Sequence, residues 1–207
     1  YTLAENSKTW DSRFGCVWEP VYRPNGRGLV APVRSNGSWT IAENGSPIWD
    51  SRFMQLWNQR LSPDGEHIAA VVAPGFGQWT VVLDDRSWKT SFNNLVLPPV
   101  FSPDGRRVAA GVRANGSWGV VVDDTTWPET YDMVWDPVFS PSGDRAVAKV
   151  ERDGRFAYAV DGKVWSPWYE GLWEPVFSPD GNRLLIRAVE NGTYLRQVVP
   201  FDSSFQG

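Results

Sequence analysis

The chain has 207 residues, 42% of them hydrophobic, which is enough to form a core and excludes a disordered chain by composition. Its net charge of −4 gives no electrostatic support for nucleic-acid binding. With a single cysteine, Cys16, and a single histidine, His67, the sequence excludes an internal disulfide and a thiolate metal cluster.

The predicted elements are short strands that recur in one order along the chain. The opening YTLAENSKTW matches WTIAENGSPIW at Trp39–Trp49 and predicts the third and fourth strands of a repeat, strands c and d. The first full repeat then begins with strand a over Val17–Tyr22, which a Pro-x-Gly turn closes. Strands b (28–34) and c (38–43) follow, joined by an Asn-Gly hairpin turn. Pro32 predicts a bulge in strand b, because proline donates no hydrogen bond to a sheet.

Tryptophan marks the repeat, since 13 residues are tryptophan and five of them are evenly spaced. These five, which lie about 39 residues apart, are Trp10, Trp49, Trp88, Trp127 and Trp165. Four antiparallel strands in each repeat of about 40 residues are typical of a β-propeller. The sequence therefore predicts a single all-β domain over 1–207, a five-bladed β-propeller of four-stranded antiparallel blades.

The ends of the chain predict how this propeller closes. Pairing of the N-terminal strand with the last blade would remove an open sheet edge, and this is the favoured prediction. However, FDSSF at Phe201–Phe205 also resembles WDSRF at Trp10–Phe14, so either Tyr1–Phe14 or Phe201–Phe205 supplies the closing strand. The two arrangements predict a monomer or a strand-paired dimer. Whether an upstream segment was removed stays open, because the chain begins at Tyr1.

The pentapeptide Trp-Asp-Ser-Arg-Phe, present at Trp10 and at Trp49, is interpreted as structural. The five evenly spaced tryptophans are expected to pack between neighbouring blades, because a buried indole removes on the order of 200 Å² from water. The aspartate and serine side chains are expected to bind backbone amides of loops, and Arg13 and Arg52 to lie along aromatic rings. A ligand pocket repeated in each blade is the alternative.

One position of strand a gives the candidate site, because strand a lines the channel of a propeller. The residues at this position are Glu19, Asn58, Pro98, Asp136 and Glu174. Three of these residues are carboxylates, and Glu19, Asn58, Asp136 and Glu174 are predicted to line the channel. A solvated lining is the favoured interpretation. A site that attracts a cation or a basic group of a partner is one alternative, and glycoside hydrolysis by Glu19, Asp136 and Glu174 is another.

Two aromatic residues outside the repeat pattern, Phe76 and Trp168, are predicted interface residues, because packing between blades does not require them. His67 begins a strand without a nucleophile beside it in the sequence, and Cys16 is expected to be a small buried thiol. No metal site and no cofactor are predicted. No apolar run reaches the ~18–20 residues that span a membrane.

The segment PVFSPDGRRVAAGVR, at Pro99–Arg113, resembles the blades of TolB-type and WD40-like propellers. The tryptophan-rich pattern, W-x-x-x-F leading into V-W-x-P-V-F-S-P-D-G, more specifically resembles TmcD, the tryptophan-rich subunit of a transmembrane electron-transfer complex of sulfate-reducing bacteria. This resemblance implies a bacterial, cytoplasmic scaffold that is associated with a membrane through its partners, the other subunits of such a complex.

The function predicted from the sequence is therefore a protein-interaction scaffold that is not an enzyme and binds no nucleic acid. Binding of a carbohydrate or another small ligand is the alternative, and glycosidase activity is a third hypothesis.

Overall fold

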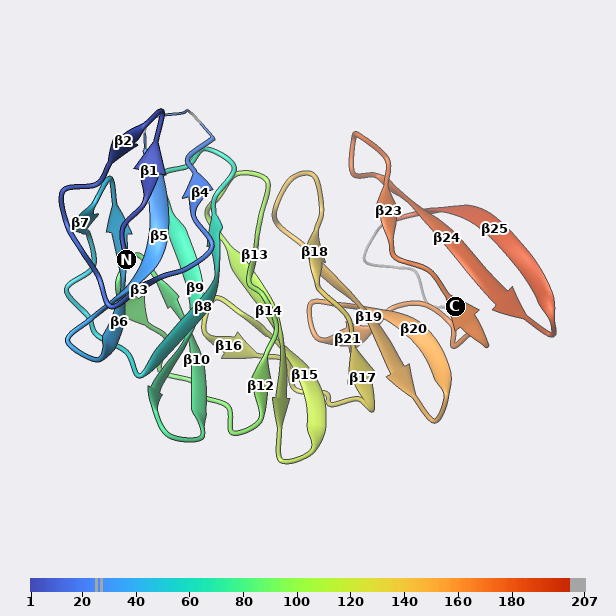
Figure 1. The fold of residues 1–207 in the computed structure, drawn as a ribbon. Coiled ribbons are helices and arrows are strands. Elements are labelled where there is room, and N and C mark those ends of the chain that lie inside the picture. Colours follow the sequence, from blue (N-terminus) through green and yellow to red (C-terminus); the bar gives the residue numbers. More distant parts are fainter. Residues whose placement is uncertain (25, 27, 202–207) are drawn as a thin grey trace.

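The computed structural model describes residues 1–24, 26 and 28–201, and these residues form strands, turns and bends without a helix. The strands make six antiparallel sheets that stand side by side in a row (Figure 1). The predicted all-β architecture is confirmed. One of the sheets is the N-terminal hairpin of β1 (Ala4–Glu5) and β2 (Lys8–Thr9), and the other five are here named sheets 1 to 5 in chain order.

The five numbered sheets have the following strands. Sheet 1 consists of β3 (Cys16–Val17), β4 (Val21–Tyr22), β5 (Leu29–Ser35), β6 (Ser38–Glu43) and β7 (Ser46–Pro47). Sheet 2 consists of β8 (Gln55–Leu61), β9 (Ile68–Gly75), β10 (Gln78–Leu83) and β11 (Arg86–Ser87). Sheet 3 consists of β12 (Leu95–Val96), β13 (Val100–Phe101), β14 (Val108–Ala114), β15 (Ser117–Val122) and β16 (Thr125–Thr126). Sheet 4 consists of β17 (Met133–Val134), β18 (Val138–Phe139), β19 (Ala146–Arg152), β20 (Arg155–Val160) and β21 (Lys163–Val164). Sheet 5 consists of β22 (Gly171–Leu172), β23 (Val176–Phe177), β24 (Arg183–Glu190) and β25 (Thr193–Pro200).

Strand a is interrupted in four of the five sheets, where it forms two short pieces such as β3 and β4. The interruption falls at Glu19-Pro20 in sheet 1 and at equivalent X-Pro pairs in sheets 3, 4 and 5, because proline lacks an amide for the ladder. Sheet 2 has Gln59 in place of the proline, and its β8 is continuous with a shift in register. The bulge predicted at Pro32 is wrong: Pro32 pairs with Ile41 in regular register, and the irregularity lies in strand a.

The core lies between neighbouring sheets, because strands b and c of sheets 1 to 4 are buried on both faces, whereas most residues of β25 in sheet 5 are exposed. Alternate residues of β5 illustrate this, since Leu29 and Ala31 pack against the N-terminal hairpin while Val30 packs toward sheet 2. Trp49 lies in the same cluster as Val30 and Leu56, between sheets 1 and 2. Of the five evenly spaced tryptophans, Trp10, Trp49, Trp127 and Trp165 are 4–8% exposed and Trp88 is half-buried.

The predicted closure of the ring is not confirmed, and neither is the count of five blades. The N-terminal hairpin has the strand c–d geometry expected for it, because the Phe14 amide donates to the Tyr1 carbonyl at 2.8 Å, as Phe53 does to Trp39 at 2.9 Å. It packs on sheet 1, where Trp10 and Phe14 are buried, and sheet 5 stands at the opposite end of the row (Figure 1). Of the alternative closing segment, Phe201 is described and 202–205 lie outside the described residues.

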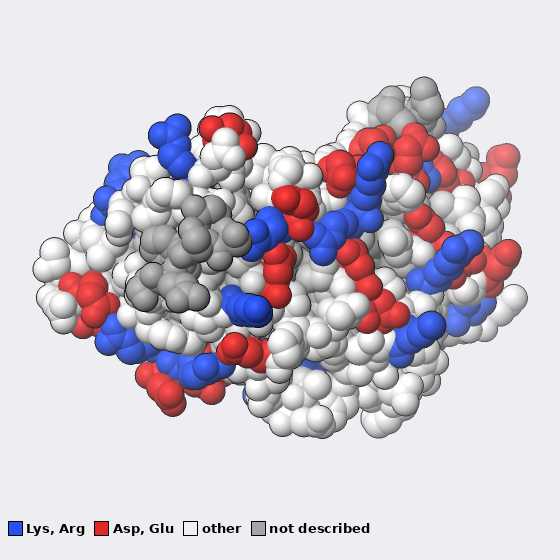
Figure 2. Space-filling view, turned by 180° about the vertical axis from the view of Figure 1, so that it is seen from behind, with Lys and Arg blue, Asp and Glu red and all other residues white. Residues whose placement is uncertain are grey.

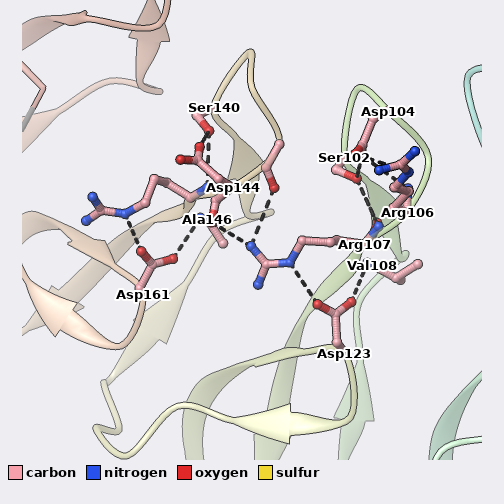
Figure 3. Close-up of polar contacts among 12 residues, drawn as sticks. Ser102, Asp104, Arg106, Arg107, Val108, Asp123, Ser140, Asp144, Ala146 and Asp161 are labelled. Atoms are coloured by element: carbon pink, nitrogen blue, oxygen red, sulfur yellow. Dashed lines mark hydrogen bonds and ion pairs between the residues drawn. The ribbon is translucent and has the colours of Figure 1, made fainter.

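A repeated polar motif joins neighbouring sheets at the end that carries the a–b and c–d turns (Figure 3). Asp123, in the c–d turn of sheet 3, accepts from the Val108 amide and from Arg107 Nε, both at 2.8 Å. The other end of the Arg107 guanidinium donates to the Asp144 carbonyl in sheet 4 at 2.7 Å. In sheet 2, His67 takes the place of this arginine, and its Nδ1 lies 2.6 Å from the Asp84 carboxylate.

Charged side chains of both signs are interspersed over one face of the molecule (Figure 2). Neither sign covers that face continuously, which agrees with the nearly balanced 20 basic and 24 acidic residues. This face therefore presents no extended field of one sign.

Candidate functional site

The edge of the row that strand a forms, here called the strand-a edge, carries exposed aromatic side chains. Trp18 in sheet 1 is 55% exposed and Trp173 in sheet 5 is 44% exposed. Each indole lies against an aromatic ring of strand c in its own sheet, at 5.9 Å from Trp39 and 5.5 Å from Tyr194, respectively. Edge and tilted ring contacts of this kind fix the orientation of a side chain, so these indoles form preorganised surfaces.

The first cavity of the strand-a edge lies between sheets 1 and 2 and has a volume of about 440 Å³. Its lining residues are Trp18, Trp39, Gln55, Leu56 and Trp57. Trp57 is held by Trp79, with ring centroids 4.7 Å apart. Apolar walls with a single amide are suited to an apolar or aromatic group that makes one hydrogen bond.

The second cavity, also about 440 Å³, is contributed by sheets 3, 4 and 5. Its lining residues are Leu97, Met133, Val134, Trp135, Asp136, Val138 and Glu174. Lys149 lies beside this cavity with its ammonium 4.1 Å from the centre of the Trp135 ring and 3.8 Å from the Glu174 carboxylate. The side chain of Lys149 is only 12% exposed, and the cation contacts the rings of Trp135 and Phe156 as well as the Glu174 carboxylate.

A second cation, Arg187, stands on the neighbouring strand b in sheet 5. Its Nη2 donates to the Glu174 carbonyl at 3.4 Å, and its buried Nε has no hydrogen-bond partner within the described part of the chain. The Tyr158 hydroxyl donates to the Trp173 carbonyl at 2.7 Å, and burial, reinforced by Glu174, raises the pKa of this phenol, so it stays protonated. The second cavity therefore combines an aromatic floor with cations and carboxylates.

The structure brings together only two of the predicted channel residues. Asp136 and Glu174 line the second cavity, whereas Glu19 and Asn58 lie in sheets 1 and 2, with left-handed φ values of 30° and 53° at the irregularity of strand a. The Glu19 carbonyl accepts a hydrogen bond from the Gln59 amide. Within the residues that the structure describes, no group of three or more His, Cys, Asp or Glu side chains could hold a metal ion.

The predicted interface residues differ in exposure. Phe76, at the b–c turn of sheet 2, is 95% exposed, whereas Trp168 is half-buried against the cluster between sheets 3 and 4, with the Arg152 guanidinium 5.4 Å from its ring. Cys16 and His67 are half-buried. In the described part of the chain there is no helix that could cross a membrane.

Sequence reasoning missed Lys149 and Arg187, although a signal for them exists. The residues that occupy the same position of strand b in the five sheets are Pro32, Val71, Gly111, Lys149 and Arg187. The carbonyl of Lys149 accepts from Trp135, as that of Pro32 does from Trp18, so this position lies beside the strand-a tryptophan. Strand b is the most apolar strand of the repeat, so a charged side chain within it indicates that this position does not serve hydrophobic packing in sheets 4 and 5.

The comparisons with known proteins support a β-propeller fold. No family model matches the chain, and no curated protein does. Among solved structures, it resembles the β-propeller domain of the Trilobed protease from Pyrococcus furiosus, which has an open velcro topology (TM-score 0.52, 15% identity, 93% of this chain and 70% of that one). It also resembles a protein from Listeria monocytogenes (TM-score 0.51, 12% identity, 88% and 62%) and TolB from Acinetobacter baumannii (TM-score 0.44, 18%, 87% and 49%). The chain thus spans about half of that TolB, and identities this low show the fold alone.

The prediction that the chain is not an enzyme is contradicted, because similar structures include enzymes. A puromycin-hydrolyzing peptidase from Mycobacterium tuberculosis matches with a TM-score of 0.47 and 15% identity over 94% of this chain and 38% of that one. A protein from Bacteroides fragilis described as a putative 6-phosphogluconolactonase matches with a TM-score of 0.40 and 16% identity, over 91% of this chain and 66% of that one. The fold by itself neither excludes nor establishes catalysis.

Proposed function

We propose that this chain is a protein-interaction scaffold that binds a partner protein along the strand-a edge. The observation that carries the proposal is the set of large hydrophobic side chains exposed on this edge, among which Trp18 and Trp173 are 55% and 44% exposed. Tryptophan is among the residues that contribute most to protein interfaces, and exposed apolar patches mark interaction sites. The aromatic contacts that orient these indoles reduce the entropy lost on binding.

The two cavities define what such a partner would present. The first cavity fits an apolar or aromatic side chain, and the second fits an apolar group flanked by charge, because Lys149, Asp136 and Glu174 surround it. The resemblance to TmcD supports a partner from a membrane-associated electron-transfer complex. A five-bladed ring, completed in that assembly, is part of this proposal.

Native purification of the tagged chain from its own host tests the proposal. We expect a partner subunit in one-to-one ratio that carries haem or an iron–sulfur cluster, with at least tenfold less of it on Trp18→Ala and Trp173→Ala. Phe76→Ala is the matched control, because Phe76 is 95% exposed but lies at a b–c turn away from strand a. Equal recovery of the partner subunit with all three variants would contradict binding along the strand-a edge. Recovery of no stoichiometric partner would contradict the scaffold role.

Binding of a carbohydrate or another small ligand is the second candidate function. The first cavity favours it, because three indoles, one leucine and one amide line an open volume of about 440 Å³. A glycan array with the wild-type chain and with Trp57→Ala tests this candidate. Binding that Trp57→Ala abolishes would support it, and absence of binding across the array would count against carbohydrate.

A further inference from the structure

An aspartate from the next sheet fastens the d segment of sheet 1. The amides of Asp50 and Ser51 donate to the two carboxylate oxygens of Asp85 at 2.8 and 3.0 Å. The Ser51 hydroxyl also donates to the Asp85 carbonyl at 3.3 Å. Asp85 occupies the second position of the c–d turn in sheet 2, so the contact joins the two sheets.

The junction of sheets 2 and 3 repeats this arrangement with other side chains. The amides of Lys89 and Thr90 both donate to the Asp124 carboxylate at 2.9 Å, and the Thr90 hydroxyl donates to the Asp124 carbonyl at 3.1 Å. Burial opposes ionisation of Asp124, but the hydrogen bonds outweigh it, so the pKa of this carboxyl is lowered. In both junctions, two backbone amides and one hydroxyl thus bind an aspartyl residue, although the first amide belongs to Asp50 in one junction and to Lys89 in the other.

The junction between the N-terminal hairpin and sheet 1 has the same donors but lacks the aspartate. Asp11 and Ser12 correspond to Asp50 and Ser51, and Gly45 stands where Asp85 would be. In the described part of the chain, neither the two amides nor the Ser12 hydroxyl has a hydrogen-bond acceptor.

A hollow of about 310 Å³ is lined in part by Asp11, the neighbour of Ser12 in the chain. Its lining residues are Glu5, Asn6, Lys8, Thr9, Trp10, Asp11 and Asn44. It therefore reaches from Asp11 to Asn44, the residue before Gly45, and it is also lined by Trp10, the residue against which a Cβ at position 45 would lie. Lys8 adds a cation to this lining and Glu5 adds a second carboxylate, whereas the carboxylate of Asp11 is no obstacle, because Asp50 stands at the same position beside Asp85.

We propose that this hollow is a binding site for a carboxylate group, which takes the place of the missing aspartate. The amides of Asp11 and Ser12 each donate to one carboxylate oxygen. When the carboxylate belongs to an aspartyl residue, the Ser12 hydroxyl also donates to the backbone carbonyl of that residue. Either a small free carboxylate or an aspartyl residue of a partner supplies this chemistry. The site is independent of the strand-a edge.

Amide NMR of the uniformly ¹⁵N-labelled chain tests the proposal with two probes. Sodium acetate represents a free carboxylate, and N-acetyl-aspartic acid N-methylamide represents an aspartyl residue, with sodium chloride at equal ionic strength as control. We expect saturable shifts of the Asp11 and Ser12 amides with one or both probes, while the Asp50 and Ser51 amides, which Asp85 occupies, do not respond. Response only to the aspartyl probe identifies a peptide ligand; response to neither, or an equal response to chloride, overturns the proposal.

Two substitutions are expected to change carboxylate binding in opposite ways. Gly45→Asp supplies the carboxylate internally and is expected to abolish the response of Asp11 and Ser12. Aspartate adopts φ of 67° at Asp85 in the equivalent position, although a Cβ at Gly45 would lie 3.1 Å from the Trp10 Cβ. Asp85→Gly is the converse variant, which keeps the test decisive if Gly45→Asp does not fold: it is expected to make the Asp50 amide respond. Unchanged titration of either folded variant would overturn the proposal.

Discussion

Removal of one buried tryptophan tests whether indoles hold neighbouring sheets together. Trp49 is 4% exposed and contacts the edge of Phe53 at a centroid distance of 6.5 Å. It shares a cluster with Val30 of sheet 1 and Leu56 of sheet 2, so Trp49→Ala would empty the space between these sheets. The hydrogen bond of the Thr40 hydroxyl to the Trp49 carbonyl, at 3.0 Å, does not depend on the indole and is retained.

The expected cost follows from the buried area. About 200 Å² of indole surface at ~25 cal/mol per Å² corresponds to about 5 kcal/mol. This value is an upper estimate, because the unfolded chain already buries part of that surface. Buried Trp→Ala substitutions generally cost about 3–5 kcal/mol. We therefore expect Trp49→Ala to lower the free energy of unfolding by about 3–5 kcal/mol.

Urea unfolding followed by far-ultraviolet circular dichroism measures this loss without relying on tryptophan fluorescence. Trp18→Ala is the matched control, because it removes the same side chain from a site that is 55% exposed, and we expect a cost below about 1.5 kcal/mol. Equal losses for the two variants, or a loss below about 1 kcal/mol for Trp49→Ala, would refute the reasoning that interlocked indoles stabilise the row of sheets.

Three further predictions concern titratable side chains. The hydrogen bond to Asp84 raises the pKa of His67 above 6.5, so its contribution to stability is complete below that pH and is lost as pH rises through the folded value. Because both side chains are more than 40% exposed, we expect this pair to contribute less than about 1 kcal/mol to the free energy of unfolding. His67→Arg should remove the pH dependence, which is measured by comparing unfolding curves at pH 5.5 and 8.5. Identical pH profiles for the wild type and the variant would contradict the role of His67. Tyr158→Phe should cost about 1–2 kcal/mol in urea unfolding, because the Trp173 carbonyl loses its donor, and an unchanged midpoint would count against that bond. Lys149→Met should leave stability unchanged or raise it by about 1 kcal/mol, and a loss above about 2 kcal/mol would show that the ammonium stabilises the fold.

The strands and turns could be predicted from the sequence because their signals are local. The expected strand c over 38–43 coincides with β6, and the Asn36-Gly37 turn has the positive φ values, 51° and 84°, that its hairpin requires. Closure could not be predicted in this way. Trp10 and Phe14 bury themselves against sheet 1 whether the hairpin ends an open row or completes a ring, so the repeat pattern is the same in both cases.

Contacts between repeats were also beyond local reasoning. The pentapeptide was expected to bind loop amides through its Asp and Ser side chains, whereas the amides of Asp50 and Ser51 are themselves the donors, and Asp85 of the next repeat is the acceptor. Arg52 was expected along an aromatic ring, but its Nη1 donates to the Trp49 carbonyl at 2.7 Å and to two further carbonyls of its own loop. Asp85 lies 35 residues after Asp50, about one repeat away, and periodicity alone does not show which group of each repeat faces the next.

A repeated fold provides its own reference for locating function, because the same backbone position occurs in several sheets. Where the residue changes without a change of backbone, packing does not account for the substitution. Lys149 stands where Val71 packs in sheet 2, and burying an ammonium there is unfavourable unless something compensates for it. Gly45 stands at the position where sheet 2 has Asp85, which fastens two sheets, and among the described residues the amides of Asp11 and Ser12 have no acceptor. Both departures forgo stability that other repeats of this chain retain, so ligand binding is to be sought at these positions.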